Sequence, residues 1–168
     1  MAHLWLTGMM GTGKSSIGRL LAERHGLPFY DLDEMIESSA GMSIPELFAA
    51  HGEEGFRRME AAVVVEVASA DAGVVATGGG AVLSKENVEA MRASGTIVLL
   101  RASPDELERR LAGSDGRPLL PGPNRTARIA RLLEAREAAY ERAADVSINT
   151  DGFDPSDLAT RIEETCDI

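Results

Sequence analysis

The sequence predicts a three-layer α/β domain, in which helices cover both faces of a five-stranded parallel sheet. Short apolar runs alternate along the chain with longer segments of helical period, and strands that alternate with helices in this way form parallel sheets. The runs are apolar on both faces, which is typical of strands covered on two sides. A chain of 168 residues has the length of one domain, so we expect a single domain over 1–168.

The expected strands and helices follow one another in a regular order. The five apolar runs are 4–7, 28–30, 74–77, 96–100 and 146–148. The segments of helical period are 14–25, 32–39, 44–51, 53–70, 85–93, 104–111, 125–142 and 155–164. Parallel sheets bind ligands at the carboxyl ends of their strands, so the residues that follow each run are the first candidates for a functional site.

One segment, about 113–124, interrupts this order. It is rich in glycine and proline and lies between two helical segments. Connections of this length without regular structure are usually functional or disordered. We expect a mobile lid over the site, and a disordered connection is the alternative.

Composition and charge exclude several classes of partner. Seventeen basic against 27 acidic side chains give a net charge of -10, which repels nucleic acid. No apolar run approaches the ~20 residues of a membrane span. Cys166 has no second cysteine to pair with, and His3, His25 and His51 lack the spacing of metal ligands, so we expect these histidines at the surface. With no signal peptide before the first motif, a cytoplasmic protein is expected.

The strongest motif is a phosphate-binding loop. Residues 8–15 match the pattern G-x-x-x-x-G-K-[ST] in full, with an apolar strand before them and an amphipathic helix after them. Glycines let backbone N–H groups turn inward around phosphates, and the helix N-terminus adds its dipole. Lys14 supplies positive charge to the β- and γ-phosphates, and the Ser15 hydroxyl binds Mg²⁺. A glycine-rich turn that merely begins a helix is the alternative, and the full context disfavours it.

A second magnesium contact should come from an acid at the end of a neighbouring strand. Asp31 follows the run 28–30, and Asp33 comes two residues later. The run 74–77 ends in Thr77 rather than in an acid, which leaves Asp31 and Asp33 as the leading candidates. Either could instead cap the following helix, and position alone does not decide between the two roles.

Two helical segments carry arginine where apolar residues are expected. Arg136 lies on the apolar stripe of 125–142, and Arg57 lies at the edge of the inward face of 53–70, three residues before Glu60. A charge on an inward face needs a partner of opposite sign. Arg57 could pair with Glu60 for structural reasons and Arg136 could reach the surface, or both could bind an anionic ligand.

Three consecutive glycines, 78–80, follow the third apolar run directly. Glycines at the carboxyl end of a strand permit very close approach of the backbone to a ligand. A tight turn between strand and helix is the competing explanation, although such a turn seldom needs three glycines.

Taken together and in this order, these motifs resemble those of the shikimate kinase family, a branch of the nucleoside-monophosphate-kinase-like P-loop proteins. The resemblance covers nearly the whole chain and is carried by 8–16, 31–33, 52–60, 78–80 and 117–120, with Arg136 and Tyr140. It implies the strand order 2-3-1-4-5 and a single kinase domain, with the P-loop at 8–16, acceptor-binding helices at about 32–60 and a lid at about 113–124. It also implies MgATP-dependent transfer of the γ-phosphoryl group to the 3-hydroxyl of shikimate.

The resemblance assigns the acceptor site residue by residue. Asp33 binds the acceptor hydroxyls and is the candidate base for the 3-hydroxyl. Shikimate's carboxylate and ring are held by Arg57, Arg136 and the backbone of Gly78, Gly79 and Gly80, and Glu60 orients Arg57.

It assigns the nucleotide site in the same way. ATP is bound by Gly11, Thr12, Gly13, Lys14, Ser15, Ser16, Arg109, Arg110 and Arg117. Lys14 and Arg117 act on the transferring phosphate, Arg117 from the lid. Ser15 binds Mg²⁺ and Asp31 contacts it through water. The adenine lies between Arg109 or Arg110 and the loop 149–155, which lacks the arginine that some relatives carry there.

Three other functions remain open. A kinase for another small hydroxylated acid, such as gluconate, would share the P-loop and differ in the acceptor pocket. A nucleoside-monophosphate kinase would phosphorylate AMP or CMP. A nucleotide-binding regulatory protein would bind ATP without turnover, although every catalytic position is filled here. We expect a monomer that binds neither nucleic acid nor membrane.

Overall fold

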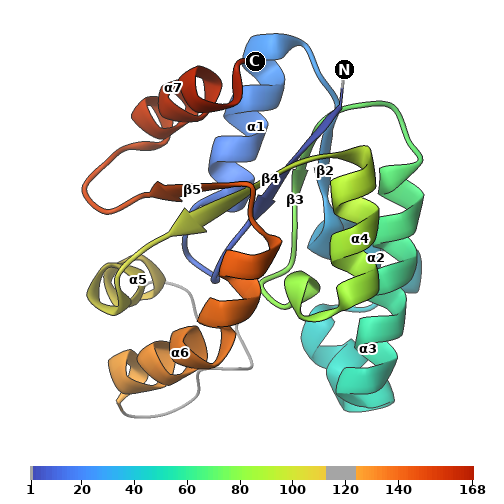
Figure 1. The fold of residues 1–168 in the computed structure, drawn as a ribbon. Helices are drawn as coiled ribbons and strands as arrows, with labels where there is room; N and C mark the ends of the chain where they lie inside the picture. Colours follow the sequence, from blue (N-terminus) through green and yellow to red (C-terminus); the bar gives the residue numbers. More distant parts are fainter. Residues whose placement is uncertain (1, 113–123) are drawn as a thin grey trace.

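The computed structural model describes residues 2–112 and 124–168 and arranges them around one central sheet (Figure 1). All strand pairs are parallel, in the order β2-β3-β1-β4-β5, which confirms the expected fold class and order. The strands are β1 His3–Thr7, β2 Phe29–Asp31, β3 Val74–Ala76, β4 Gly95–Arg101 and β5 Val146–Asn149. Each bound lies within one residue of the expected one.

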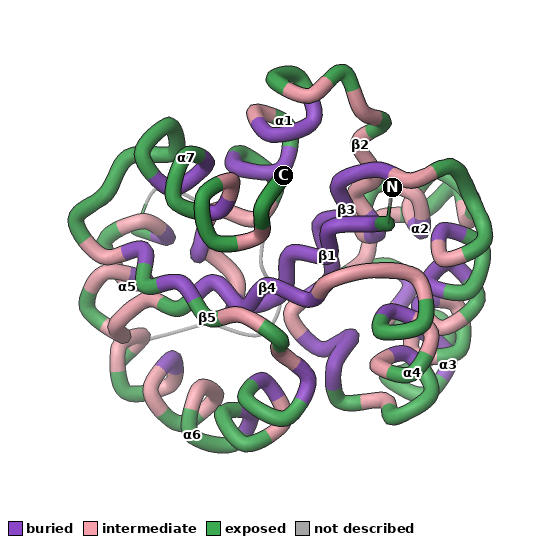
Figure 2. Tube along the Cα trace, turned by 45° about the horizontal axis from the view of Figure 1, so that its top comes forward, coloured by how far each residue is buried: buried purple, intermediate pink, exposed green. Residues whose placement is uncertain are grey.

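Helices cover both faces of the sheet. They are α1 Lys14–His25, α2 Leu32–Ala40, α3 Ile44–Ala68, α4 Lys85–Ser94, α5 Pro104–Leu111, α6 Arg125–Ala143 and α7 Pro155–Cys166, with a short 3-10 helix η1 at Ala81–Leu83. Figure 2 shows the buried strands as a line between two groups of helices, α1 and α7 on one side and α2, α3, α4 and α6 on the other. The sequence did not predict η1, which begins directly after the three glycines.

Successive core side chains of the central strand β1 point to opposite faces of the sheet. Leu4 and Leu6 pack with α1 and α7, whereas Trp5 between them packs with α3 and α4 on the other face. Strands β1 and β3 are buried along their whole length. The edge strands β2 and β5 are only partly covered, so apolar residues on both faces characterise the central strands alone.

A break at Gly52 divides α3 into two parts. Its φ of 67° lies in the left-handed region that favours glycine, and this interrupts the helix without ending it. The two expected helices at 44–51 and 53–70 are therefore one element with a kink between them. The second part carries Arg57 and Glu60.

The expectation that His3 lies at the surface was wrong. Its side chain is buried, and Nδ1 accepts a hydrogen bond from the backbone N–H of Gly73 at 3.2 Å. The imidazole also contacts the rings of Trp5 and Tyr30. His3 is thus a buried residue with a hydrogen-bond partner at the start of the central strand.

Part of the expected lid, including Arg117, lies outside the described residues. Within 2–112 and 124–168, no helix has the length and apolar character needed to cross a membrane.

Candidate active site

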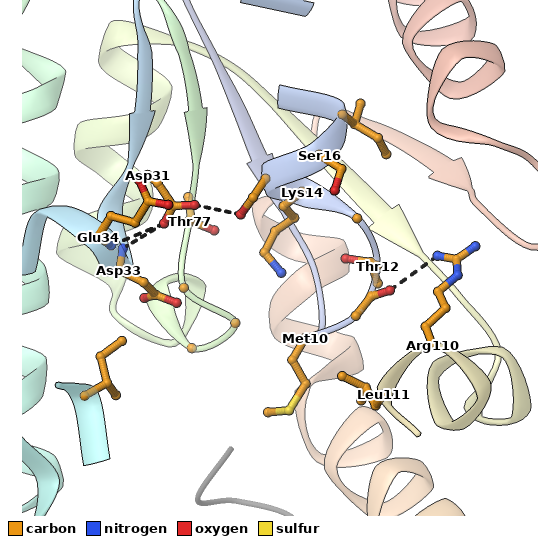
Figure 3. Close-up of a pocket in the computed structure, with 18 of the residues that line it drawn as sticks. Met10, Thr12, Lys14, Ser16, Asp31, Asp33, Glu34, Thr77, Arg110 and Leu111 are labelled. Atoms are coloured by element: carbon orange, nitrogen blue, oxygen red, sulfur yellow. Dashed lines mark hydrogen bonds between the residues drawn. The ribbon is translucent and has the colours of Figure 1, made fainter. Parts of the chain in front are cut away.

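A cavity of about 800 Å³ lies at the carboxyl ends of the strands. It is lined from the P-loop, from the start of α2, from both parts of α3, from the glycines after β3, and from α5, α6 and the loop before α7. Figure 3 shows Asp31 and Asp33 on one side of Lys14, and Arg110 on the other side beyond Thr12. All the described residues that the sequence predicted for the site line this one cavity: Gly11, Thr12, Gly13, Lys14, Ser15, Ser16, Asp31, Asp33, Arg57, Gly78, Gly79, Gly80, Arg109, Arg110 and Arg136.

The P-loop has the backbone that its sequence requires. Gly11 and Gly13 have φ values of 84° and 95°, which side chains rarely permit. A Cβ at Gly8 would collide with the carbonyl oxygen of Leu100 on β4. The Lys14 Nζ donates to the carbonyl oxygens of Gly8 and Met9, both at 2.9 Å, so the ammonium group lies over the loop. Positive charge and inward N–H groups at the N-terminus of α1 form a site for phosphates.

Asp31 caps α2, one of the two roles that the sequence left open, and it also accepts a hydrogen bond from Ser15 of the P-loop. Its Oδ1 accepts hydrogen bonds from the backbone N–H groups of Asp33 and Glu34 at 3.2 and 3.4 Å, which caps α2. Its Oδ2 accepts a hydrogen bond from the Ser15 hydroxyl at 2.6 Å. A hydroxyl and a carboxylate oxygen side by side at a phosphate site are ligands that suit Mg²⁺, so these residues fit the expected metal.

Arg57 lies over the glycine loop and pairs with Glu60, as its spacing predicted. Its Nη1 donates to Glu60 Oε2 at 2.7 Å, and Nη2 lies 3.5 Å from Glu53. A Cβ at Gly80 would lie 2.5 Å from Nη1 of Arg57, so the close approach depends on the missing side chain. A larger residue at the third of these glycines would therefore displace the guanidinium group of Arg57.

A Cβ at Gly78 would likewise meet two carboxylates. It would lie 2.8 Å from Oε1 of Glu60 and 3.0 Å from Oδ1 of Asp33. Glu60 is 1 % exposed, and burial raises the pKa of its carboxyl despite the opposing effect of Arg57. The Asp33 charge adds to this increase. Two acids and a guanidinium group therefore surround the glycines at one end of the cavity.

Arg136 is buried on the inward stripe of α6, which excludes the interpretation that it reaches the surface. It is 8 % exposed, and its Nη1 donates to the carbonyl oxygen of Gly79 at 3.3 Å. The Tyr140 hydroxyl donates to the same oxygen at 2.6 Å. A second cationic group thus faces the glycine loop from the side opposite to α3.

The sequence missed an apolar wall at this end of the cavity. The rings of Phe48 and Phe56 are stacked with centroids 4.7 Å apart, and both line the cavity beside Ile44 and Pro45. The two phenylalanines lie on either side of the Gly52 break, and the kink brings them together. The sequence signal that could have predicted this wall is the equal spacing of the two phenylalanines, each four residues from Gly52.

At the opposite end of the cavity, Arg110 and Arg109 differ in their hydrogen-bond partners and in their exposure. Arg110 donates to Thr150 Oγ1 at 3.0 Å, to the Thr150 carbonyl oxygen at 2.8 Å and to the Gly11 carbonyl oxygen at 3.3 Å. Arg109 is 71 % exposed in its side chain and donates to Glu106. Hydrogen bonds from Arg109 and Arg110 lower the pKa of Glu106 to about 2. Arg110 therefore joins the P-loop to the loop before α7, and Phe153 and Pro155 of that region complete the lining.

Comparisons with known proteins show which family the chain resembles. The model of the family described as "Shikimate kinase" matches residues 10–167. The shikimate kinase of Symbiobacterium thermophilum is 48 % identical over 164 residues, covering 96 % of this chain and 94 % of the relative. The shikimate kinase of Thermodesulfovibrio yellowstonii is 41 % identical and covers 96 % and 93 %.

Solved structures show the same likeness. A shikimate kinase from Acinetobacter baumannii, in complex with shikimate, superposes with a TM-score of 0.94 at 36 % identity and covers 98 % of this chain and 92 % of that one. A gluconokinase from Sinorhizobium meliloti shares the fold with a TM-score of 0.58 at 17 % identity, covering 98 % and 94 %. The family model and the identities agree: the chain belongs to the shikimate kinase family.

Proposed function

We propose that this protein transfers the γ-phosphoryl group of MgATP to the 3-hydroxyl of shikimate, giving shikimate 3-phosphate and ADP. The observation that carries the proposal is the single cavity that joins the P-loop to two arginines on opposite sides of a glycine loop. One end suits a triphosphate, and the other suits a small acid that bears hydroxyl groups. Family membership supports the same reaction.

The acceptor's carboxylate binds between Arg57 and Arg136. Planar guanidinium groups bind carboxylates through paired N–H donors, and such bonds are stronger than neutral ones. The Gly78, Gly79 and Gly80 backbone permits the ring to approach closely, and the Phe48–Phe56 wall covers its apolar edge. Gluconate and AMP lack this combination of a ring and a carboxylate.

The donor end neutralises the charge of the phosphates. Gly11, Thr12, Gly13, Lys14 and Ser16 of the P-loop surround them with N–H groups and one ammonium group. Ser15 and Asp31 would hold Mg²⁺, which supplies further positive charge to the β- and γ-phosphates when bound. Arg110, with Arg109 beside it, borders the adenine at the far end.

Asp33 orients the acceptor's 3-hydroxyl. It lies on the acceptor side of Lys14 (Figure 3), and its Oδ1 faces Gly78. Phosphoryl transfer passes through a loose transition state, which demands alignment more than early removal of the proton. A carboxylate in this place can therefore act by positioning the hydroxyl and accept its proton as the new bond forms.

The chain forms one kinase domain over 1–168 and acts as a cytoplasmic monomer, with the P-loop at 8–16, acceptor-binding helices at about 32–60 and a lid at about 113–124. Arg117 acts on the transferring phosphate from that lid. The sequence motif and the resemblance to the family support the proposed lid and the proposed role of Arg117.

ADP release with MgATP, measured in parallel with shikimate, gluconate, AMP and no acceptor, tests the proposed reaction. We expect release that requires shikimate. ADP release with gluconate or AMP instead would show that the proposed acceptor is wrong. No ADP release with any of the three, despite ATP binding, would indicate a nucleotide-binding protein without turnover.

Variants test the acceptor site within the same assay. Arg57→Ala or Arg136→Ala should raise the shikimate KM about 10- to 100-fold, because each removes charge-assisted hydrogen bonds. Arg58→Ala is the matched control, since Arg58 neighbours Arg57 but is 70 % exposed in its side chain and pairs with Glu54. An unchanged shikimate KM in both site variants would refute the carboxylate site.

A further inference from the structure

We infer that Tyr140 is a positioning residue of the acceptor site, because its hydroxyl holds the Gly79 carbonyl and so sets the orientation of the Gly79–Gly80 peptide. The inference rests on the proposed function, in which this peptide borders the acceptor's carboxylate. It assigns a role to a side chain on α6 that faces the glycine loop but is absent from the lining of the acceptor cavity.

The contact is short, and the tyrosine that makes it is buried. The Tyr140 hydroxyl donates to the Gly79 oxygen at 2.6 Å, and the side chain is 3 % exposed. It joins α6 to the loop after β3, two segments that are 61 residues apart in sequence. Burial raises the pKa of the Tyr140 phenol above its usual value, so the hydroxyl remains a donor at neutral pH.

The loop supplies only part of this rigidity itself. The carbonyl oxygens of Gly78 and Gly80 accept backbone hydrogen bonds from Ala81 and Leu83 at 3.2 and 3.0 Å, whereas the Gly79 carbonyl is held from α6. Gly78 and Gly80 favour the absence of a side chain, because a Cβ at Gly78 would lie 2.8 Å from Glu60 Oε1 and one at Gly80 would displace the Arg57 guanidinium group. Successive glycines have more backbone freedom than any other residues, so their conformation has to be fixed from outside. The bond from Tyr140 provides such a constraint at the central glycine.

The peptide plane extends the constraint to the next N–H group. The chain has no cis peptide bonds among the described residues, so the Gly80 N–H points opposite to the Gly79 carbonyl. Because that carbonyl points to α6, the N–H points away from α6. A hydrogen bond that holds the Gly79 carbonyl therefore also fixes the direction of the Gly80 N–H donor.

Tyr140 also leaves Arg136 available to an anion. Arg136 Nη1 donates to the same Gly79 oxygen, at the longer distance of 3.3 Å. If Arg136 turned its donors toward a carboxylate, the half-buried carbonyl would otherwise lose its hydrogen bond, which costs about 1–3 kcal/mol. With Tyr140 still donating, the carbonyl stays satisfied and Arg136 can bind the ligand without that penalty.

Tyr140→Phe tests the inference, with Tyr30→Phe as the matched control. Both variants lose one phenolic hydroxyl that donates to a backbone carbonyl, since Tyr30 donates to Asp71 at 3.0 Å outside the active-site cavity. We expect Tyr140→Phe to weaken shikimate binding, measured by titration calorimetry, about 3- to 10-fold, the effect of one hydrogen bond. The affinity for ATP should stay within about 2-fold of wild type, and Tyr30→Phe should leave both affinities unchanged.

A double-variant cycle separates positioning from a loss of stability. In an Arg136→Lys background, Tyr140→Phe should weaken shikimate binding by a smaller factor than it does in the wild-type protein, because both side chains act on one carbonyl. Unchanged shikimate affinity in Tyr140→Phe, or an equal loss for shikimate and ATP, would overturn the positioning role while leaving the proposed function intact. A wild-type protein that neither binds nor phosphorylates shikimate would overturn the proposed function and this inference with it.

Discussion

Arg57 and Glu60 form an ion pair that uses only one of the two carboxylate oxygens. Arg57 Nη1 donates to Oε2 of Glu60, whereas Oε1 is buried and has no hydrogen-bond partner in the described part of the chain. Burial is the largest influence on the pKa of Glu60, and with the Asp33 charge it raises this pKa against the lowering effects of Arg57 and Arg136. The ionised carboxylate is thus less favourable in the folded chain than in water.

The stability of the protein should therefore depend on pH through Glu60. Above the ordinary value of 4.5 and up to the raised pKa, the folded state keeps a proton that the unfolded state has released. The free energy of unfolding then falls as pH rises through this window, by at most about 1.4 kcal/mol per pH unit for one group. Urea denaturation at a series of pH values upward from the ordinary value of 4.5 measures this fall.

Glu60→Gln identifies the group responsible. Glutamine does not titrate, so the variant should lose this component of the pH dependence while other groups still contribute theirs. Glu89→Gln is the control, because Glu89 is 65 % exposed in its side chain and pairs with Lys85 at the surface. Equal pH profiles for wild type and Glu60→Gln would show that Glu60 is already ionised at low pH.

Gly80→Ala should weaken the acceptor site through Arg57. The new Cβ would lie 2.5 Å from Arg57 Nη1 and 2.6 Å from Cζ, so the guanidinium group must move. Gly80 has a φ of -109°, which alanine adopts without strain, so stability should change little. We expect a shikimate KM about 10-fold higher with the ATP KM unchanged, the cost of displacing one charged hydrogen-bonding group.

The cause can be checked by removing the colliding side chain. In an Arg57→Ala background, Gly80→Ala should have no further effect on the shikimate KM, because nothing remains to be displaced. Additive losses in the double variant would instead mean that the backbone of Gly80, and not Arg57, is disturbed.

Local pattern predicted the parts of the site that depend on neighbours in sequence. The P-loop motif carries its own turn and helix start, so its position followed from residues 8–15 alone. Arg57 and Glu60 are three apart on one helix, which predicted their pair. Arg136 lies on an apolar stripe, and its burial confirms that a charge there faces inward.

Contacts between distant segments could not be predicted in this way. The bond between Tyr140 and Gly79, and those between Arg110 and Thr150, exist because the sheet order brings the ends of β3, β4 and β5 near α5 and α6. No periodicity within one element contains that information. The expectation that His3 lies at the surface was wrong for a similar reason, since its partner Gly73 belongs to the loop before the neighbouring strand.

Asp31→Asn should separate the two roles of that side chain. Asparagine caps helices as well as aspartate does, so the bonds to the start of α2 are retained. The negative charge beside Ser15 is lost, and we expect the Mg²⁺ concentration for half-maximal ADP release to rise about 10-fold, as when a partner of a metal site is removed. Asp31→Ala should show the same shift and also lose about 1 kcal/mol of stability with the cap. Unchanged Mg²⁺ dependence in both variants would restrict Asp31 to capping.

Arg110→Ala should weaken nucleotide binding more than Arg109→Ala, although the two residues are adjacent. Arg110 joins the Gly11 carbonyl of the P-loop to Thr150, so its loss releases both loops that border the nucleotide end of the cavity. Arg109 is largely exposed and pairs with Glu106, a surface interaction worth little. We expect the dissociation constant for ATP, measured by titration calorimetry, to rise about 10-fold in Arg110→Ala and less than about 3-fold in Arg109→Ala, with shikimate binding unchanged in both. The opposite order would mean that the exposed guanidinium group of Arg109 is the one that contacts the adenine, and that Arg110 serves the fold alone.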